Sequence, residues 1–416
     1  MRFFSQVTLF LCIAVLCTSP TTFGSRFKRG SRRQPVLFNR YICPPQCACS
    51  LNIIYCSGKQ LNEIPSTFPR NGEFLHLENN YITRIHSGVF RHFPAIQRII
   101  LTKNRLISAG LKARSFEGLT ALKRLDLSEN KLTRFPRSLP PSLVELRLNL
   151  NNITKVKRGA TRGLTNLVAL SLFRNSITDA GFEPAILKNM TALSYLDLNE
   201  NLLETVPQGL PESLREIRLE NNGLKNVTAG IFTSQSLLHH FSLRNNQLSD
   251  QGINFNAWSN MSNLFLLDLS YNKLRTIPRG LPPSLHQLII ENNFIEEINY
   301  KTFISSLNLT QIKLSFNKIR IITPGSFTRL IHLRFLDLAF NNLLYVPRGL
   351  PTTLEALFLE SNQIFSVQID SFCPMNPERF VTSKLHTLRL DGNLIDSNDL
   401  PALAFYCLSS MEVVVT

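Results

Sequence analysis

The cysteines are the residues of this 416-residue chain best placed to do covalent chemistry. Cys12 and Cys17 lie in an apolar amino-terminal run, and the other six form a cluster and a distant pair: Cys43, Cys47, Cys49, Cys56, and then Cys373 and Cys407. An even number of cysteines in an oxidising compartment predicts disulfides. A four-thiolate zinc site needs a reducing compartment and usually two separated Cys-x-x-Cys knuckles, which the sequence lacks. The separation favours two local bridges and one carboxy-terminal bridge, while the exact pairing stays open.

Motifs for catalysis are missing from the sequence. It contains no phosphate-cradling Gly-Lys loop, no His-Glu-x-x-His and no nucleophile elbow. The eight histidines are scattered, and the carboxylates fall at regularly repeated positions that suggest no acid–base pair. We therefore expect a binding protein without cofactor or metal rather than an enzyme.

The amino-terminal residues indicate the compartment. Arg2 precedes an apolar run from Val7 to Cys17, which is too short for a membrane span and typical of a signal peptide. Small residues at Thr22 and Gly24 predict cleavage before Ser25, so residues 1–24 are expected to be removed. No later stretch reaches the roughly 20 apolar residues of a membrane helix. These features predict a secreted protein without membrane anchor, for which nucleic acid is an unsuitable partner.

The formal net charge of +16 points to acidic partners, and its densest part is the segment 25–42. This segment has six cations and no acid before Tyr41: Arg26, Lys28, Arg29, Arg32, Arg33 and Arg40. For a secreted chain, such an arm predicts salt-sensitive binding of heparan sulfate. Two alternatives stay open: Arg26 to Lys28-Arg29 has the form of a convertase site, and the segment also suits an unstructured solubilising leader.

Five sequons predict N-linked glycans. They are centred on Asn152, Asn189, Asn226, Asn260 and Asn308. Asn189 and Asn260 occupy equivalent positions just before expected strands, which would place their glycans on a rim and leave an open face free for binding.

A repeated phrase, Leu-x-Leu-x-x-Asn-x-Leu, organises most of the chain. Its asparagines are Asn80, Asn104, Asn130, Asn151, Asn175, Asn201, Asn222, Asn246, Asn272, Asn293, Asn317, Asn341, Asn362 and Asn393. The spacings of 24, 26 and 21 residues recur in order, so a super-repeat of 71 residues is written into the sequence. A near-repeat around Ile54 and Cys56 precedes them, as a cap would.

The phrase predicts a leucine-rich-repeat solenoid, of the α/β class with mostly parallel β-strands on its concave face. Alternating leucines make a short strand that buries one side. Stacked asparagines can satisfy the turns of neighbouring coils, and stacking closes a core that no single repeat can form. Recurrent prolines such as Pro136 and Pro207 predict extended or polyproline segments outside, with 3₁₀ or brief helical turns expected at 116–122 and 327–333.

Residues flanking the two leucines should line the concave face, where acidic and basic side chains mix. Aromatic residues are interleaved with them: Phe173, Tyr195, Tyr271, Phe316, Phe335, Phe340 and Phe358. Mixed charge with exposed aromatics favours protein recognition. The alternative is a solvated face whose aromatics only cover neighbouring strands, but Phe335, Phe340 and Phe358 make that region more apolar than solvation requires.

Together these motifs resemble the small leucine-rich proteoglycan family over nearly the whole chain from Cys43 onward. The spacing Cys43-x3-Cys47-x-Cys49-x6-Cys56 is similar to the amino-terminal cap of its decorin and biglycan branch. The stretched final repeat between Cys373 and Cys407 resembles the ear of its lumican and fibromodulin branch, and the high repeat number leans toward the podocan or extracellular matrix protein 2 branch. The resemblance implies pairing of Cys43 with Cys49, Cys47 with Cys56, and Cys373 with Cys407.

The resemblance also implies a division of the chain and a set of partners. The cap would span 43–68, the repeats 69–366 and the ear repeat with its cap 367–416. Fibrillar collagen or another matrix protein is the implied partner of the concave face, and a soluble growth-factor trap or co-receptor is the alternative. Because segment 25–41 contains no Ser-Gly dipeptide, we expect a glycoprotein without a glycosaminoglycan chain there.

Overall fold

The computed structural model describes residues 43–157, 159–232, 236–373, 382–396, 400–408 and 412–414. The expected signal peptide (1–24) and the basic arm (25–42) lie outside the described residues. In the described part, no helix has the length and apolar character that crossing a membrane requires.

One sheet runs through the described repeats, and each of the fourteen copies of the phrase contributes a strand to it. These strands are β3 (Phe74–His76), β4 (Arg98–Ile100), β5 (Arg124–Asp126), β6 (Glu145–Arg147), β7 (Ala169–Ser171), β8 (Tyr195–Asp197), β9 (Glu216–Arg218), β10 (His240–Ser242), β11 (Leu266–Asp268), β12 (Gln287–Ile289), β14 (Gln311–Lys313), β16 (Phe335–Asp337), β17 (Ala356–Phe358) and β18 (Thr387–Arg389). Within the described ranges, β2 (Ile53–Tyr55), β1 (Ala48–Ser50) and β19 (Glu412–Val414) complete a 17-stranded sheet. All neighbours are parallel except β1 and β2, so the predicted solenoid is confirmed.

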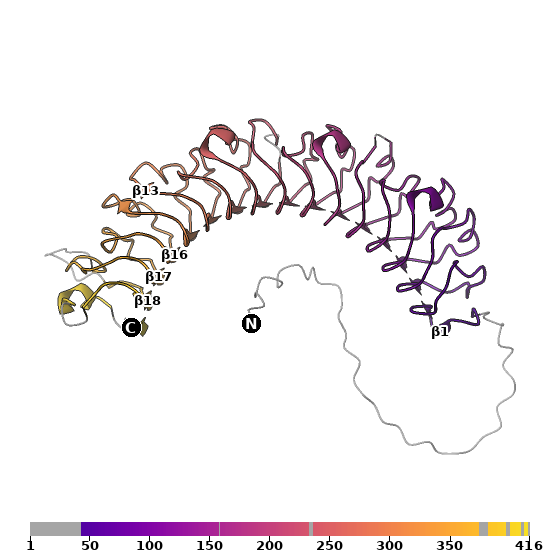
Figure 1. Ribbon diagram of the computed structural model, residues 1–416, viewed down its shortest axis with the longest axis horizontal. Coiled ribbons are helices and arrows are strands. Elements are labelled where there is room, and N and C mark those ends of the chain that lie inside the picture. The colour runs from indigo at the N-terminus through magenta and orange to yellow at the C-terminus, as the bar shows by residue number, and fades with distance from the viewer. Residues whose placement is uncertain are drawn as a thin grey trace, which may run out of the picture. The chain divides into compact units, whose positions relative to one another are not determined.

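The strands line the inner side of an arc formed by the repeats (Figure 1). In each of the fourteen repeat strands, the central residue and the apolar residue two positions after it are buried, as Leu336 and Leu338 are in β16 and the turn that follows it. These side chains belong to a continuous apolar core that extends from the cap to the last repeats. A short second sheet, β13 (Glu297–Ile298) with β15 (Ile321–Ile322), lies outside this row.

The asparagine ladder explains why the phrase keeps its polar residue. Asn130 Nδ2 donates to Leu127 O of its own repeat at 3.0 Å and to Leu101 O of the preceding repeat at 2.9 Å. Its Oδ1 accepts the backbone N–H of Leu106 at 2.9 Å. One side chain thus satisfies backbone groups of two coils, and its burial makes those bonds stabilising.

Disulfides close the two ends of the described solenoid. Cys43 is joined to Cys49, and Cys47 to Cys56, beside the antiparallel strands of the cap. A third disulfide joins Cys373 to Cys407 across the ear repeat. These are the pairings that the family resemblance implies.

The outer side departs from the sequence expectation in one respect. Segments 116–122 and 327–333 form turns, whereas the 3₁₀ turns among the described residues are Ser108–Gly110, Asp179–Gly181, Asp250–Gly252 and Ala402–Phe405. The first three recur at the 71-residue period. A Cβ on Gly110, Gly181 or Gly252 would overlap a backbone carbonyl of the preceding coil, so close coil contact requires glycine there.

Candidate functional site

The concave face consists of two columns of side chains, one on each side of the buried central residue of every strand. The register of β16 and β17 pairs Phe335 with Ala356 and Asp337 with Phe358. Neighbouring strands lie about 4.8 Å apart, so side chains of adjacent repeats touch along each column. Any ligand of this face would therefore meet several repeats at once.

Charges on the amino-terminal half of this face are paired with one another. Arg124 Nε lies 3.3 Å from Glu145 Oε2, and Arg147 Nη2 lies 2.6 Å from Glu145 Oε1. Arg218 Nε lies 2.7 Å from Glu216 Oε1 in the same way. These cations already have carboxylate partners, and within the described residues Glu78 Oε2 is the buried carboxylate oxygen of this half that has no hydrogen-bond partner.

The carboxy-terminal half is different because its carboxylates outnumber their partners. Burial raises the pKa of Glu291, Asp337 and Glu360, and neighbouring carboxylates raise it further. Lys313 Nζ reaches Glu291 Oε1 only at 3.9 Å. Glu360 Oε2 is buried and has no hydrogen-bond partner among the described residues. A ligand that supplies a cation or a hydrogen-bond donor would therefore stabilise the carboxylates on this part of the face.

Four of the predicted aromatic residues form two contacting pairs on the repeats of β14, β16 and β17. Phe335 and Phe358 lie with ring centroids 5.1 Å apart, and Phe316 stacks on Phe340 at 4.2 Å with an interplanar angle of 7°. Phe316 and Phe340 are 48% and 44% exposed. We call these four residues the aromatic patch. Aromatic side chains supply large contact area at low entropic cost, which suits a binding surface.

The backbone under half of this patch is strained. The residue before each ladder asparagine adopts a left-handed conformation, with φ of 56° at Phe316 and 54° at Phe340. Glycine or asparagine tolerates this region, whereas a bulky residue there is an outlier. Because all fourteen repeats share this conformation before the asparagine, it belongs to the turn of the repeat and does not single out the patch. Sequence reasoning missed it, although the fixed position before the asparagine was a usable signal.

The other three predicted aromatics stand apart from the patch. Tyr195 is half-buried, with the Arg218 guanidinium 5.5 Å from its ring centroid. Tyr271 is exposed, and the Arg244 guanidinium lies 4.2 Å from the centroid of its ring. Phe173 is half-buried, and its N–H donates to Asn149 Oδ1 at 3.1 Å. Each is engaged with its own neighbours, so the structure does not bring them into the patch.

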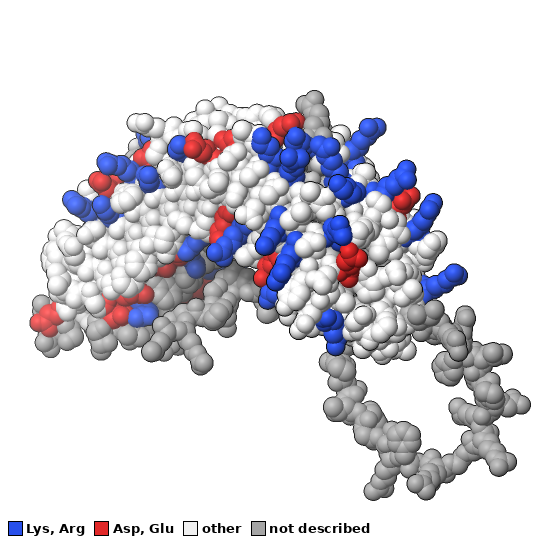
Figure 2. All heavy atoms as spheres, turned by 45° about the vertical axis from the view of Figure 1, so that its right-hand side comes forward, with Lys and Arg blue, Asp and Glu red and all other residues white. Residues whose placement is uncertain are grey.

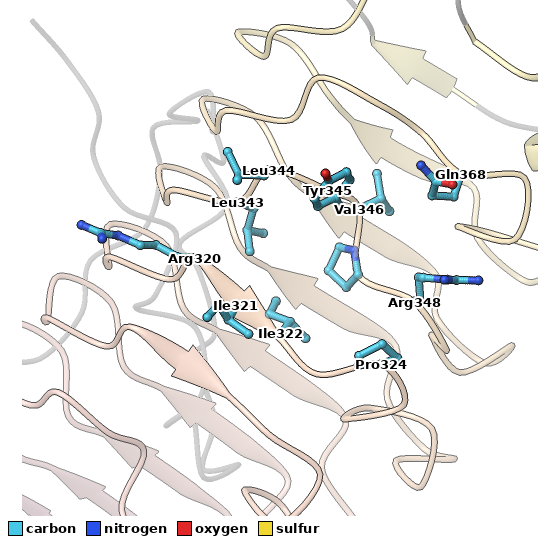
Figure 3. A pocket seen from close by; sticks show the side chains of 11 residues that line it. Arg320, Ile321, Ile322, Pro324, Leu343, Leu344, Tyr345, Val346, Arg348 and Gln368 are labelled. Carbon is cyan, nitrogen blue, oxygen red and sulfur yellow. The ribbon is translucent and has the colours of Figure 1, made fainter.

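A second surface, which sequence reasoning missed, lies on the flank of the last repeats. Ile321 and Tyr345 are 61% and 51% exposed, and they line a groove of about 440 Å³. Figure 3 shows the groove between neighbouring coils, with the side chains of Arg320 and Arg348 on its lining. Arg348 is paired with Asp370. The available signal was the fourth position after the ladder asparagine, which is apolar at Ile321 and Tyr345 and polar in the earlier repeats.

The sequon asparagines lie outside the strands of the sheet. Asn152, Asn189, Asn226 and Asn308 are exposed, and Asn260 is half-buried with Nδ2 donating to Phe232 O at 2.9 Å. Asn308 Nδ2 similarly donates to Pro283 O at 2.9 Å. Glycosylation of all five stays a prediction, and glycans on these atoms would leave the concave columns uncovered.

The chain is similar to known leucine-rich-repeat proteins over most of its length. The family model described as leucine rich repeat matches residues 141–203, 212–274 and 283–343, and the leucine rich repeat N-terminal domain matches 42–69. Podocan of Mus musculus is 34% identical over 87% of this chain and 59% of its own length. Podocan-like protein 1 of Homo sapiens is 34% identical over 85% of this chain and 68% of its own. Lumican of Homo sapiens is 35% identical over 70% and 81%.

Solved structures support the fold alone. A leucine-rich-repeat protein of Leptospira interrogans superposes with a TM-score of 0.63 at 24% identity, covering 86% of this chain and 94% of that one. A chain from the octameric complex of latrophilin 3, Unc5D and FLRT2 gives a TM-score of 0.61 at 23% identity, covering 88% and 100%. The described chain is thus a leucine-rich-repeat solenoid by structure as well as by sequence.

Proposed function

Because the chain belongs to the small leucine-rich proteoglycan family, we propose that it is a secreted glycoprotein of the extracellular matrix that binds matrix proteins of collagen type through its concave face. The chain spans 59% of the length of mouse podocan, so the binding role is argued from its own residues. The proposal assigns the chain a binding role and no catalysis. Its cap (43–68), repeats (69–366) and ear (367–416) serve to present that face.

The observation that carries the proposal is the aromatic patch beside unbalanced carboxylates. Lys313 Nζ lies 5.8 Å from the Phe335 ring centroid, and Asp337 lies between Phe335 and Phe340 along the chain. Apolar rings would receive the prolines of an extended matrix protein, while Asp337 and Glu360 would receive its lysines or arginines. Because the pKa of each carboxyl is raised by burial, a bound cation would stabilise the charged form.

The test is binding of the secreted, full-length protein to fibrillar type I collagen at low and near-physiological salt. We expect saturable binding that survives salt, because aromatic contacts are not screened. Phe335→Ala with Phe358→Ala should lower the affinity at least tenfold, whereas Phe173→Ala, a concave aromatic outside the patch, should leave it unchanged. Equal effects of the two changes, or no collagen binding at all, would contradict the proposal.

A growth-factor trap is the alternative use of the same face. It predicts a protein that diffuses into the medium, whereas a matrix component stays with the cell layer. Failure to bind collagen together with accumulation in the medium would favour the trap.

The absence of a glycosaminoglycan chain is tested by electrophoresis. A sharp band that chondroitinase does not change would agree with a glycoprotein, and a smear that the enzyme converts to a sharp band would not.

The basic arm is proposed as a separate binder of heparan sulfate. Its support is the sequence alone, since the six cations between Arg26 and Arg40 lie outside the described residues. Amino-terminal sequencing of secreted material would distinguish a start at Ser25 from one at Gly30, which would follow cleavage at the convertase-like site.

A further inference from the structure

The positive charge of the folded repeats is concentrated on one flank of the amino-terminal half. Figure 2 shows Lys and Arg side chains gathered over this half of the molecule, with few Asp and Glu among them. Five exposed cations form the part that we call the basic flank: Arg105, Lys131, Arg134, Arg137 and Lys155. All five follow the ladder asparagines of the second, third and fourth repeats, on the outer side of the coil.

The backbone places these cations on adjacent coils. Arg134 and Lys155 are direct partners in a parallel bridge, and Lys131 pairs with Ile107 of the coil before it. The basic flank therefore extends over three successive coils, a distance of about 10 Å along the solenoid. The Arg105 guanidinium lies 4.3 Å from the centroid of the Tyr81 ring, which holds it on the same side.

Carboxylates are missing from this flank. None of the five cations has an ion pair with a described residue, and segments 105–116, 131–144 and 152–168 contain no Asp or Glu. Acids border these segments, and exposed Glu117 follows directly after the first of them. On one side of the flank, Glu63 pairs with Arg84 at 3.2 Å. On the other side, Asp179 and Glu183 lie in the fifth repeat.

The 71-residue super-repeat provides an internal comparison that excludes a merely structural origin for this charge. Positions equivalent to the five cations are Ser176, Leu202, Thr205, Gln208 and Asn226 in the second super-repeat. In the third they are Gln247, Lys273, Thr276, Arg279 and Glu297. The second super-repeat builds the same coil geometry with none of the five cations and the third with two of them, so the solenoid does not need the full set.

At one position of the super-repeat, a neutral serine in the first copy takes the structural role that an aspartate has in the second and third copies. Asp179 Oδ1 accepts the backbone N–H groups of Glu204 and Thr205 at 3.0 and 3.3 Å, and Asp250 does the same one super-repeat later. In the first super-repeat Ser108 Oγ accepts the equivalent N–H groups, those of Thr133 and Arg134, at 2.8 and 3.0 Å. A neutral hydroxyl thus replaces a carboxylate beside Arg134.

We propose that the basic flank is a binding site for a sulfated glycosaminoglycan chain, distinct from both the concave face and the amino-terminal arm. Long exposed cations dominate this outer surface, although Ile107 (45% exposed) and Tyr81 (40% exposed) lie beside Lys131 and Arg105, and such a surface suits a flexible linear polyanion better than a folded protein. Sulfates would contact several coils at once, and the affinity would depend steeply on salt because counterions are released.

The test uses the full-length secreted protein and immobilised heparin over a series of salt concentrations. Lys131→Ala, Arg134→Ala and Lys155→Ala together should reduce the magnitude of the slope of log affinity against log salt by about 2–3, at about 0.7–0.9 per lost contact. The matched control is Lys273→Ala, Arg275→Ala and Arg279→Ala, which removes the same charge from the same flank of the third super-repeat. There Asp250, Glu296 and Glu297 already neutralise the surface, so we expect no change in slope.

Further variants separate this site from other anion binders. Arg32→Ala, Arg33→Ala and Arg40→Ala in the arm should leave the effect of the flank variant intact. Asn152→Gln should strengthen binding if a glycan is attached there, because Asn152 is one coil from Lys131 at the equivalent position. Desulfated heparin should bind weakly, and vesicles containing phosphatidylserine should bind no better than neutral ones.

Three results would overturn the proposal. They are equal losses in the flank and control variants, loss of heparin binding through the arm variant alone, and preference for anionic vesicles over heparin. The concave-face proposal would survive any of them, since collagen binding is measured separately with the aromatic variants.

Discussion

The strain of the left-handed backbone at Phe340 can be measured separately from the contribution of the phenyl ring. Phe340→Gly and Phe340→Ala both remove the ring and its stacking on Phe316, so that loss cancels between them. At a φ of 54°, an alanine bears a steric cost of about 1–2 kcal/mol. Glycine avoids this cost but loses about 0.5–1 kcal/mol of backbone entropy. We therefore expect Phe340→Gly to be the more stable variant by about 1 kcal/mol.

Phe335 supplies the matched control because it lies in β16, where the backbone is extended. A glycine in a strand destabilises by about 0.5–1 kcal/mol relative to alanine. The order of the two variants should consequently reverse at Phe335. A reversal between two aromatic positions of one patch cannot arise from ring removal.

The assay is urea unfolding of the four purified variants, followed by far-ultraviolet circular dichroism, together with collagen binding of each. Both Phe340 variants should bind more weakly than the unchanged protein, and to the same extent, although their stabilities differ. If Phe340→Gly is no more stable than Phe340→Ala, the strain argument is wrong. If binding follows stability instead of the presence of the ring, the patch is not the binding surface.

Three further predictions concern the ear, the ladder and a buried carboxylate. Cys373→Ser should destabilise the ear by about 2–5 kcal/mol, which limited proteolysis would detect as cleavage near the carboxy terminus; unchanged resistance would contradict it. Asn201→Ala should cost about 3 kcal/mol, because the buried amide makes four hydrogen bonds that bridge two repeats; a urea midpoint like that of the unchanged protein would refute the role of the ladder. Burial holds the pKa of Asp337 above its unfolded value, so the ionised form destabilises the fold and this cost is relieved as pH falls through the folded-state pKa. The advantage of Asp337→Asn in thermal unfolding should therefore shrink as the pH is lowered from 7 towards 4, and a constant difference would count against it.

Much of the fold could be predicted from the sequence because each repeat interacts mainly with its two neighbours. Asn130 bonds to the repeat before it and to its own, so the position of the asparagine in the sequence specifies the contact. The alternation of leucines specifies which strand residue is buried. The same locality explains why strand positions could be located from the spacing of the phrase. The 3₁₀ turns were misplaced because they depend on close approach of coils at glycines such as Gly181, which composition does not reveal.

The candidate sites depended on tertiary structure to a greater extent. The sequence by itself determined that aromatics and charges occupy outward positions of the repeats, because the strand period of two fixes the face of every residue. Only the tertiary structure decided that Phe335 meets Phe358 and Phe316 meets Phe340, while Tyr195 and Tyr271 are held by arginines. Lateral register between coils, and the rotamers and left-handed turns that follow from it, determine which side chains touch. Those contacts join residues more than twenty positions apart, and no local pattern encodes them.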